Sequence, residues 1–365
     1  MIERLRNLVR PLRVRWGRRV FYKIEELELA STIRERRLAR DNHLTNDQLA
    51  PLSIIVKVKN EPEFLEAWLE YHGKLVGLDN ILILDNESDS EKHLNLLKRY
   101  SDKAYVVRLP GFYDNFHYPH LYPQPYQWAA SRSRYVTFLD IDEFLVARAG
   151  DCLSGKNLFS QLAHPETKAF AGIWLWNKEP LAAESLAVSD PVVFTAPDPG
   201  LLGYGTVAGK SIVRADALTE AKVVGHNLQN ESMLPLFNDK SFGEIFVLHL
   251  SQLNPALMRK RSRQHLQAVG LLPAELDEES ALKAISNALE AGEFTERSGP
   301  WRYATQFVTG RIIEPRREYF GEGPFATTAV NEFFTGFEVP ELAEIVESFD
   351  FRQLLETEKN KFTQD

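Results

Sequence analysis

Residues 52–89 read LSIIVKVKNEPEFLEAWLEYHGKLVGLDNILILDNESD, and the pattern of this stretch decides the fold class. Residues 52–58 form a short apolar run rich in β-branched side chains, which is typical of a buried strand. From Phe64 onward the apolar residues recur at helical spacing until Gly77, where we expect the helix to end. Residues 81–84 predict a second buried strand. A strand, a helix and a strand with short connections predict a parallel β-α-β unit.

The alternation of strands and helices continues along the chain. Further strands are predicted at residues 104–109, 135–139, 169–177, 191–195, 210–214 and 245–250. Further helices are predicted at residues 24–41, 90–100, 127–134, 254–269, 274–291 and 339–358. We therefore predict an α/β protein with a Rossmann-like, mainly parallel sheet flanked by helices, a helical N-terminal segment and a helical C-terminal region.

Charge is distributed unevenly between the start of the chain and the rest. Residues 1–23 carry eight arginines and lysines against one glutamate, a charge of +7, so the remaining residues sum to −15. An acidic body argues against nucleic-acid binding. The basic segment predicts either peripheral contact with an anionic membrane or packing against the acidic body of the same chain.

The composition excludes several other classes of protein. Cys152 is the only cysteine, which excludes a disulfide framework and a cysteine-based zinc site. No run of about 18 apolar residues occurs, so we expect no transmembrane helix, and the arginines near the start interrupt any signal-peptide core. We therefore expect a cytoplasmic protein, which the basic segment would allow to lie at the inner face of the cell membrane.

Polar side chains follow the predicted strands at their carboxyl ends, where parallel α/β sheets bind ligands. At the end of the first strand lie Lys57, Lys59, Asn60 and Glu61, and the second strand is followed by Asp85-Asn86-Glu87-Ser88-Asp89. The second group is able to bind a base or a ribose through side-chain hydrogen bonds. The alternative is a structural role, in which Asn60 caps the first helix and Ser88 or Asp89 caps the next one.

The triplet Asp140-Ile141-Asp142 directly follows the predicted strand at 135–139. Two carboxylates at the end of a buried strand need compensation for their charge, and a divalent cation such as Mg²⁺ or Mn²⁺ supplies it. Such a cation would neutralise the charge that grows on a diphosphate leaving group. An Asp-x-Asp triplet also occurs in solvated loops and helix caps, but the apolar strand before it favours a metal site.

Several motifs occur in a defined order over residues 52–146. They are Lys57-Val58-Lys59-Asn60-Glu61, Trp68-Leu69-Glu70-Tyr71-His72, Gly77, Ile83-Leu84-Asp85-Asn86-Glu87-Ser88-Asp89 and Leu139-Asp140-Ile141-Asp142-Glu143-Phe144. Together they resemble glycosyltransferase family 92 and its bacterial family-2-like relatives. Further along, the likeness is looser and rests on Lys210-Ser211-Ile212-Val213-Arg214, Gly225-His226, His249-Leu250 and Arg259-Lys260-Arg261-Ser262. The family usually has His-Tyr where this chain has His249-Leu250.

The resemblance implies a GT-A fold, a nucleotide-sugar donor (commonly a UDP-sugar), a requirement for Mn²⁺ or Mg²⁺, and inversion at the anomeric carbon. It implies that the metal is bound by Asp140, Asp142 and His249. The donor-binding residues that it implies are Lys57, Asn60, Glu61, Asp85, Asn86, Asp89, Gln127, Asp140, Lys210 and His226. The implied acceptor is a glycan or a glycolipid, with surface polysaccharide synthesis as the setting.

Inversion by direct displacement needs a general base that takes the proton from the acceptor hydroxyl. Glu179 is the candidate because it follows the predicted strand at 169–177, and Asp190 and Glu231 are the alternatives. The two tryptophans of that strand either stack on a sugar ring or belong to the core.

We expect three parts in the chain. Residues 1–50 form a basic, then charged, helical segment, residues 51–253 a GT-A catalytic domain, and residues 254–365 a helical region. Within the catalytic domain, residues 51–146 are the nucleotide-sugar-binding half and residues 147–253 the acceptor half.

Two other functions remain open. Another metal-dependent nucleotide enzyme, such as a nucleotidyltransferase, would also place acids at a strand end, but often has a glycine-rich loop where this chain has Asn60-Glu61-Pro62. A non-catalytic glycan- or nucleotide-binding module would be expected to lack metal ligands, whereas Asp140 and Asp142 are present. The products of donor breakdown distinguish these functions.

Overall fold

The computed structural model describes residues 25–26, 49–108, 116–149, 152–164, 166–177, 194–195, 209–225, 233–241, 244–251, 253–296 and 298–311. The basic segment 1–23, most of the helix predicted at 24–41 and the helix predicted at 339–358 lie outside these residues. In the part of the chain that is described, every helix is too short or too polar to cross a lipid bilayer.

The first half of the chain builds the predicted β-α-β units. Its elements are β2 (Ala50–Val58), α3 (Pro62–Val76), β3 (Ile81–Asp85), α4 (Glu91–Tyr100), β4 (Tyr105–Arg108), α5 (Pro123–Ala130) and β5 (Ser133–Asp140). Strand β2 pairs in parallel with β3 and β5, and β3 pairs in parallel with β4, so the four strands predicted up to residue 139 are confirmed. Helix α5 lies earlier than the predicted helix at 127–134, because Pro123 suits its first turn and Ser133 already pairs with β2.

The second half adds mostly antiparallel strands to the same sheet. They are β6 (Glu143–Ala149), β7 (Cys152–Ser154), β8 (Ala169–Asn177), β9 (Phe194–Thr195), β10 (Gly209–Arg214) and β11 (Ile245–His249), with the short helix α6 (Leu158–Gln161) between β7 and β8. The strand order, which starts at the two-residue strand β1 (Glu25–Glu26), is β1-β4-β3-β2-β5-β10-β8-β11-β6-β7, with β9 paired to β8. Of these later strands, β8 and β11 pair in parallel, whereas β10 is antiparallel to both its neighbours and β6 to β11 and β7.

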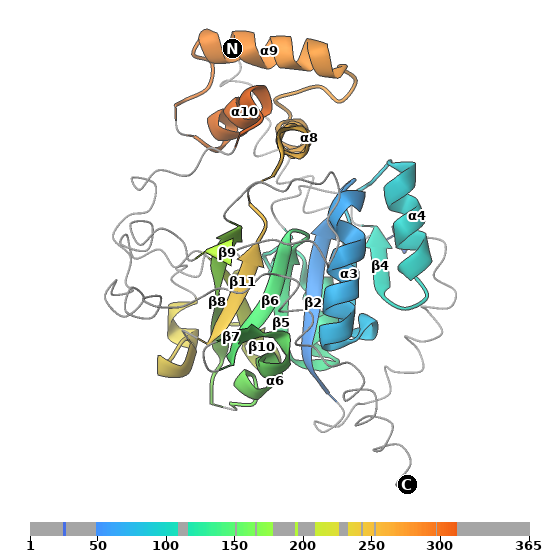
Figure 1. Ribbon diagram of the computed structural model, residues 1–365. Helices are drawn as coiled ribbons and strands as arrows, with labels where there is room; N and C mark the ends of the chain where they lie inside the picture. Colours follow the sequence, from blue (N-terminus) through green and yellow to red (C-terminus); the bar gives the residue numbers. More distant parts are fainter. Residues whose placement is uncertain are drawn as a thin grey trace.

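The α/β class is therefore confirmed as a mixed sheet flanked by helices (Figure 1). Parallel pairing is concentrated in the first half, and the sheet as a whole is less parallel than predicted. Strands β6 and β7 were not predicted. Only two residues connect them, and a connection that short fits an antiparallel pair and no parallel one.

Glu25 and Glu26 form β1, a short strand antiparallel to β4. The predicted helix at 24–41 is wrong at these two residues. Without β1, the backbone N–H and C=O groups on the outer side of β4 would lack partners within the sheet, and such an edge readily pairs with an extended segment. In the observed register, Val107 and Arg108 lie opposite the two glutamates.

Both faces of the sheet are covered by apolar packing. One face of β2, which carries Ile54 and Val56, belongs to the same buried cluster as Trp68 of α3. The other face carries Ile55, which belongs to a second cluster together with Tyr126 of α5. Because neighbouring side chains along a strand point to opposite faces, the continuous apolar run predicted at 52–58 supplies both layers.

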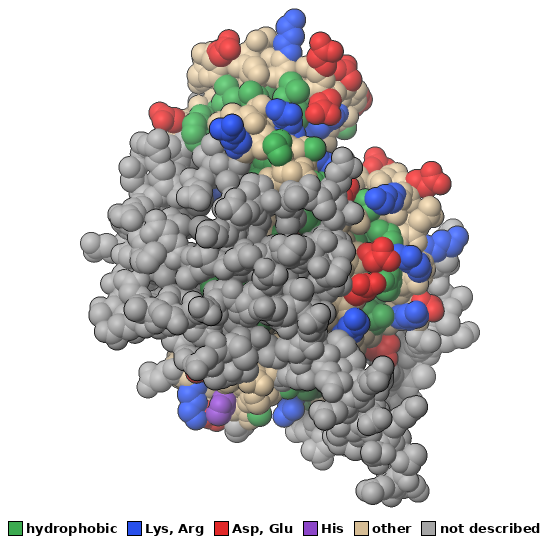
Figure 2. Space-filling model, in the orientation of Figure 1, with side chains coloured by type: hydrophobic (Ala, Val, Ile, Leu, Met, Phe, Trp, Pro, Cys, Tyr) green, Lys and Arg blue, Asp and Glu red, His purple; other side chains and the backbone are tan. Residues whose placement is uncertain are grey.

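Three helices, α8 (Pro255–Ala268), α9 (Glu278–Glu290) and α10 (Gly299–Thr309), lie beyond the carboxyl ends of the parallel strands (Figure 1). They share a small core, which consists of Leu266, Leu272, Ala281, Ile285, Ala304 and Phe307. The face of these helices shown in Figure 2 carries both acidic and basic side chains. Helices α8 and α9 confirm the predictions at 254–269 and 274–291. Helix α10 was not predicted, although Ser298 caps its start and Gly310 ends it in the left-handed conformation.

Helix α3 holds the start of β6 in place through side-chain hydrogen bonds. The Trp68 indole N–H donates to the Glu143 carbonyl at 2.9 Å, and the Tyr71 hydroxyl donates to the Leu145 carbonyl at 2.6 Å. The Leu145 N–H donates to Nε2 of His72 at 3.3 Å. The motif Trp-Leu-Glu-Tyr-His therefore positions the chain segment that directly follows the Asp-x-Asp triplet.

The burial of His72 makes stability depend on pH. Burial lowers the pKa of His72 to about 3. The neutral ring uses both nitrogens, because Nδ1–H donates to the Trp68 carbonyl at 3.1 Å while Nε2 accepts from the Leu145 N–H. In the unfolded chain, where the pKa is near 6.5, His72 takes up a proton that the folded chain excludes. The contribution of His72 is therefore complete above about pH 6.5 and is lost as the pH falls below that value.

On account of His72 alone, we expect the free energy of unfolding to fall by about 2 kcal/mol between pH 7 and pH 5, as measured by urea denaturation. His72→Gln keeps a hydrogen-bonding side chain without a titratable group, so its fall over the same range should be smaller. The matched control is His164→Gln, at a histidine whose side chain is 43% exposed, and it should behave like the unaltered protein. An unchanged pH dependence in His72→Gln would contradict this assignment.

Candidate functional site

Charged side chains from several strands meet at one edge of the sheet. In the parallel pair β2–β5, Lys57 lies opposite Asp140, and in the antiparallel pair β11–β6, His249 lies opposite Glu143. Lys210 is the second residue of β10, which lies next to β5. This is the carboxyl edge of the parallel strands, where the sequence predicts a ligand site.

Lys57, Asp140, Glu143 and Lys210 form the Asp140 cluster. Lys210 Nζ lies 2.7 Å from Asp140 Oδ2 and 3.0 Å from Glu143 Oε2. Lys57 Nζ lies 3.3 Å from Asp140 Oδ1, and the Asp140 N–H donates to Glu143 Oε2 at 2.7 Å. The side chains of Lys210 and Glu143 are fully buried, whereas 14% of the Asp140 side chain is exposed. Two lysines thus compensate two carboxylates at the end of β5.

Burial and charge compete in setting the pKa values of the Asp140 cluster. Burial by itself would lower the pKa of Lys210, but Asp140 and Glu143 outweigh it and raise that pKa above its ordinary value. Burial raises the pKa of Glu143 to about 7, although Lys210 opposes the shift. Lys210 therefore stays charged at neutral pH.

Glu143 connects the Asp140 cluster to the second half of the sheet, a role that the sequence analysis missed. Its Oε1 accepts a hydrogen bond from the Trp174 indole N–H at 2.8 Å. The Trp174 ring in turn lies 4.7 Å from the His249 ring, measured between centroids. The sequence feature that could have revealed this role is the position of Glu143 at the start of an apolar run. A carboxylate that is buried in a strand requires polar partners.

Glu61, Asp142, His249 and Arg261 form the Asp142 cluster. Arg261 Nη1 lies 2.5 Å from Asp142 Oδ2, and His249 Nε2 lies 3.4 Å from the same oxygen. Arg261 Nε lies 3.0 Å from Glu61 Oε1. The second carboxylate oxygen of Asp142, Oδ1, is buried and has no hydrogen-bond partner among the described residues.

The Asp142 cluster holds one strongly ionised carboxylate. Burial would raise the pKa of Asp142, but the Arg261 guanidinium and His249 outweigh it and hold that pKa well below its ordinary range. Burial would likewise lower the pKa of His249, but the nearby Asp142 carboxylate raises it above its ordinary value. For Glu61, burial prevails over Arg261 and raises the pKa to about 7. Asp142 is therefore the stable anion of this cluster.

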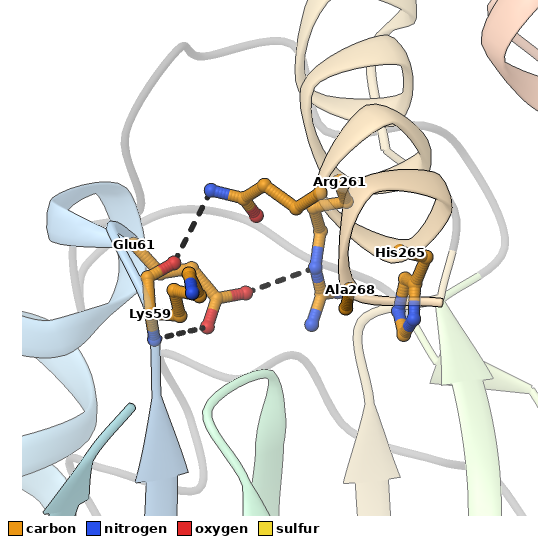
Figure 3. Close-up of a pocket in the computed structure, with 6 residues that line it drawn as sticks. Lys59, Glu61, Arg261, His265 and Ala268 are labelled. Atoms are coloured by element: carbon orange, nitrogen blue, oxygen red, sulfur yellow. Dashed lines mark hydrogen bonds and ion pairs between the residues drawn. The ribbon is translucent and has the colours of Figure 1, made fainter. Parts of the chain in front are cut away.

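A small, partly open pocket lies between the end of β2 and helix α8 (Figure 3). It is lined by Lys59, Glu61, Arg261, Gln264, His265 and Ala268. The Gln264 amide donates to the Lys59 carbonyl at 3.2 Å, and Glu61 and Arg261 face each other (Figure 3). The His265 ring stacks on Tyr303 with 4.2 Å between centroids, and burial lowers its pKa to about 3. The pocket thus combines a guanidinium, an ammonium, a carboxylate, an amide and a neutral imidazole.

The predicted metal ligands are brought together only in part. Among the residues described, no group of three or more His, Cys, Asp or Glu side chains is placed to hold a metal ion. Asp140 is engaged by Lys57 and Lys210. Asp142 and His249 do fit a divalent cation, because Oδ1 of Asp142 lacks a hydrogen-bond donor. Mg²⁺ commonly takes one or two carboxylates from a protein and its further ligands from water and substrate phosphates.

Asp85 and Asn86, which were predicted to line the nucleotide pocket, are buried. Asp85 accepts hydrogen bonds from the Ser88 N–H at 3.3 Å and lies 3.8 Å from Nε2 of His93. Burial raises the pKa of Asp85, although Ser88 opposes the shift. Asp85 is fully buried and Asn86 is 2% exposed, and neither lines the pocket of Figure 3. As placed, Asp85 supports the connection between β3 and α4, and the Asn86 N–H donates to the Val58 carbonyl at the end of β2 at 2.9 Å.

Asn60 links two loops and does not cap α3, which corrects the predicted N-cap. The residue at the N-cap of α3 is Glu61. The Asn60 side-chain oxygen accepts from the N–H groups of Asp89 at 3.0 Å and Ser90 at 2.9 Å, and its amide donates to Asp89 Oδ1 at 2.7 Å. Asn60 therefore holds the loop that leads into α4. Its φ of 54° is in the left-handed region, which asparagine tolerates better than most residues.

Of the other predicted site residues, Gln127 is described and does not join this edge. Gln127 is exposed on α5, close to the amino end of β5, which is the opposite edge of the sheet from Asp140. The remaining ones, which are Glu179, Asp190, His226, Glu231 and the side chain of Trp176, lie outside the described residues. Arg261 joins the site although no role was predicted for it. The sequence feature that could have indicated this role is the basic run Arg259-Lys260-Arg261 on the helix that follows the strand of His249.

No protein-family model and no curated protein matches the chain. Similar solved structures include S. aureus TarS 1–349, which is 14% identical, covers 69% of this chain and 74% of its own, and has a TM-score of 0.30. The mannosyltransferase PcManGT from Pyrobaculum calidifontis, in complex with GDP-Man and Mn²⁺, is 12% identical, with coverages of 77% and 93% and a TM-score of 0.32. GalNAc-T7 with UDP, GalNAc and Mn²⁺ is 11% identical, with coverages of 87% and 69% and a TM-score of 0.32. A likeness this loose carries no functional argument.

Proposed function

We propose that this chain is a metal-dependent, inverting glycosyltransferase of the GT-A type. It would transfer a sugar from a nucleotide-sugar, commonly a UDP-sugar, to a glycan or glycolipid acceptor. The observation that carries the proposal is the Asp142 cluster. There, a buried carboxylate with one unpartnered oxygen lies next to a histidine and to a guanidinium that lines a pocket. The Asp142 carboxylate is a group that binds a metal ion, and the Arg261 guanidinium is a group that binds phosphate. Their position side by side suits a metal ion together with a diphosphate.

The proposal assigns a role to each group at this edge. When bound, a divalent cation held by Asp142 and His249 would neutralise the charge that grows on the leaving diphosphate. Lys210 holds Asp140 through its 2.7 Å ion pair, and the exposed part of the Asp140 carboxylate is proposed to meet the ribose. Glu143 is a positioning residue for Lys210 and Trp174. Glu179 remains the proposed base for the acceptor hydroxyl.

The division of the chain belongs to the same proposal. Residues 51–146 would bind the donor, residues 147–253 the acceptor, and residues 254–365 would form the helical region. The basic segment 1–23 is proposed to contact an anionic membrane, at the cytoplasmic face where surface polysaccharides are made. The relation to family 92 rests on the ordered motifs of residues 52–146.

A thermal-shift screen of nucleoside diphosphates and nucleotide-sugars, with and without Mn²⁺, tests this proposal. A ligand that binds only the folded chain at about 100 times its Kd adds about 2.7 kcal/mol of stability, which corresponds to a rise of a few degrees in Tm. We expect that rise with a nucleoside diphosphate and Mn²⁺ together, and a smaller one with either alone. If no nucleotide raises the Tm under any condition, the proposed donor site is wrong.

A further inference from the structure

Helix α8 is anchored at its start and contacts the site through polar groups beyond it. Leu257 and Met258, in its first turn, belong to the main buried core. Further along, Lys260 Nζ lies 2.7 Å from Glu63 Oε1, and Arg261 bridges the Asp142 and Glu61 carboxylates. These ion pairs join a helix of the C-terminal region to the sheet edge. The charged side chains of these ion pairs can change partners more readily than packed apolar groups can. A bound ion of the same charge can replace one side chain of a pair.

Arg261 stands where a cation would be expected. Its guanidinium binds the Oδ2 oxygen of Asp142, and His249 approaches the same oxygen, at 2.5 Å and 3.4 Å respectively. A divalent cation at Asp142 and His249 would meet the positive charge of Arg261 at close range. The two cations therefore compete for one carboxylate.

Two cations line the pocket, Lys59 and Arg261, and of the two it is Arg261 that contacts Asp142. Lys210 is fully buried between two acids, and only 6% of the Lys57 side chain is exposed. Arg261 is 19% exposed and lines the pocket (Figure 3). A guanidinium presents several N–H donors in one plane, which matches the oxygens of a phosphate group.

We propose that Arg261 is a diphosphate-binding residue that the free protein holds on Asp142 and Glu61. A divalent cation that binds Asp142 and His249 displaces it, and the released guanidinium binds the diphosphate of the donor. The identity of that anion rests on the proposed function, whereas the competition between Arg261 and the cation does not. Cation and diphosphate therefore bind cooperatively.

The test compares Arg261→Met with the unaltered protein in two binding experiments on the full chain. Mn²⁺ alone is titrated and followed by electron paramagnetic resonance, and UDP is titrated at saturating Mn²⁺ by calorimetry. We expect the variant to bind Mn²⁺ about 10-fold more tightly, because the competing charge is gone, and UDP about 10- to 100-fold more weakly. A residue that only fastens α8 would not shift the two affinities in opposite directions.

Two further variants secure the comparison. Lys260→Met removes the neighbouring ion pair of α8 with Glu63 and should leave both affinities unchanged. Arg261→Lys keeps the charge but loses the planar donor set, so Mn²⁺ binding should stay near that of the unaltered protein while UDP binding weakens. Arg261→Lys also provides the test if Arg261→Met does not fold.

Each outcome has one meaning. Unchanged or weaker Mn²⁺ binding by Arg261→Met would refute the competition. Tighter Mn²⁺ binding with unchanged UDP binding would refute the diphosphate role. If the unaltered protein binds neither UDP nor another nucleoside diphosphate, the proposed function fails, and the Mn²⁺ titration still decides whether Arg261 competes with the cation.

Discussion

Asp142→Asn is expected to slow the release of nucleoside diphosphate from a nucleotide-sugar by about 100- to 1,000-fold while the chain stays folded. Asparagine has the shape of aspartate but lacks the charge that would hold a cation beside His249. Arg261 would keep its 3.0 Å ion pair with Glu61, so the cluster would not be left without any partner. The Leu250 N–H donates to the backbone carbonyl of residue 142, and this bond does not depend on the side chain.

The matched control for this variant is Asp216→Asn. Asp216 is 68% exposed and pairs with Arg214 at 2.7 Å. The substitution therefore removes an ion pair on the surface, which contributes little to stability. The release rate and the Mn²⁺ dependence should be unchanged. If Asp142→Asn kept the rate of the unaltered protein, the assignment of Asp142 to the cation would be refuted.

Lys210→Met is expected to have the largest effect on stability, a loss of about 3–5 kcal/mol in the free energy of unfolding. Lys210 is fully buried, and its Nζ lies within 3.0 Å of both the Asp140 and the Glu143 carboxylates. Methionine fills similar space but leaves Glu143 buried without its cation. Urea denaturation at neutral pH measures the loss.

Two comparisons show whether charge, and not packing, causes that loss. Lys168→Met removes an exposed ion pair with Glu220 at 3.0 Å and should cost less than about 1 kcal/mol. Adding Glu143→Gln to Lys210→Met removes the carboxylate that Lys210→Met leaves without its cation, so the double variant should be more stable than Lys210→Met alone. A double variant that is less stable by the sum of both single effects would show that the two groups do not interact.

The first half of the fold was predictable because its signals are local. Apolar runs, the helical spacing after Phe64 and short connections define β2, α3 and β3 without knowledge of distant partners. The second half was not predictable in the same way. Strand β10 pairs with β5 and β8, and this choice depends on long-range contacts that leave no mark on the spacing of its own residues.

The candidate site shows the same division. Lys57 and Asp140 were expected at one edge because both end parallel strands, and the structure places them opposite each other. Arg261 comes from a helix 119 residues after Asp142, so only the folded chain reveals their contact. Asn60 carried the right polarity for a ligand site, but its hydrogen bonds go to the loop at Asp89. The type of a residue predicts which interactions its side chain can make. The tertiary structure decides with which partner it makes them.

The most direct test of the account is to identify, by ³¹P NMR, what the full chain releases from a nucleotide-sugar in the presence of Mn²⁺. We predict slow, Mn²⁺-dependent formation of nucleoside diphosphate, which accelerates with a suitable glycan acceptor and is lost in Asp142→Asn. Release of pyrophosphate or nucleoside monophosphate, or no breakdown of any nucleotide-sugar, would contradict the claim that this edge of the sheet is a glycosyl-transfer site.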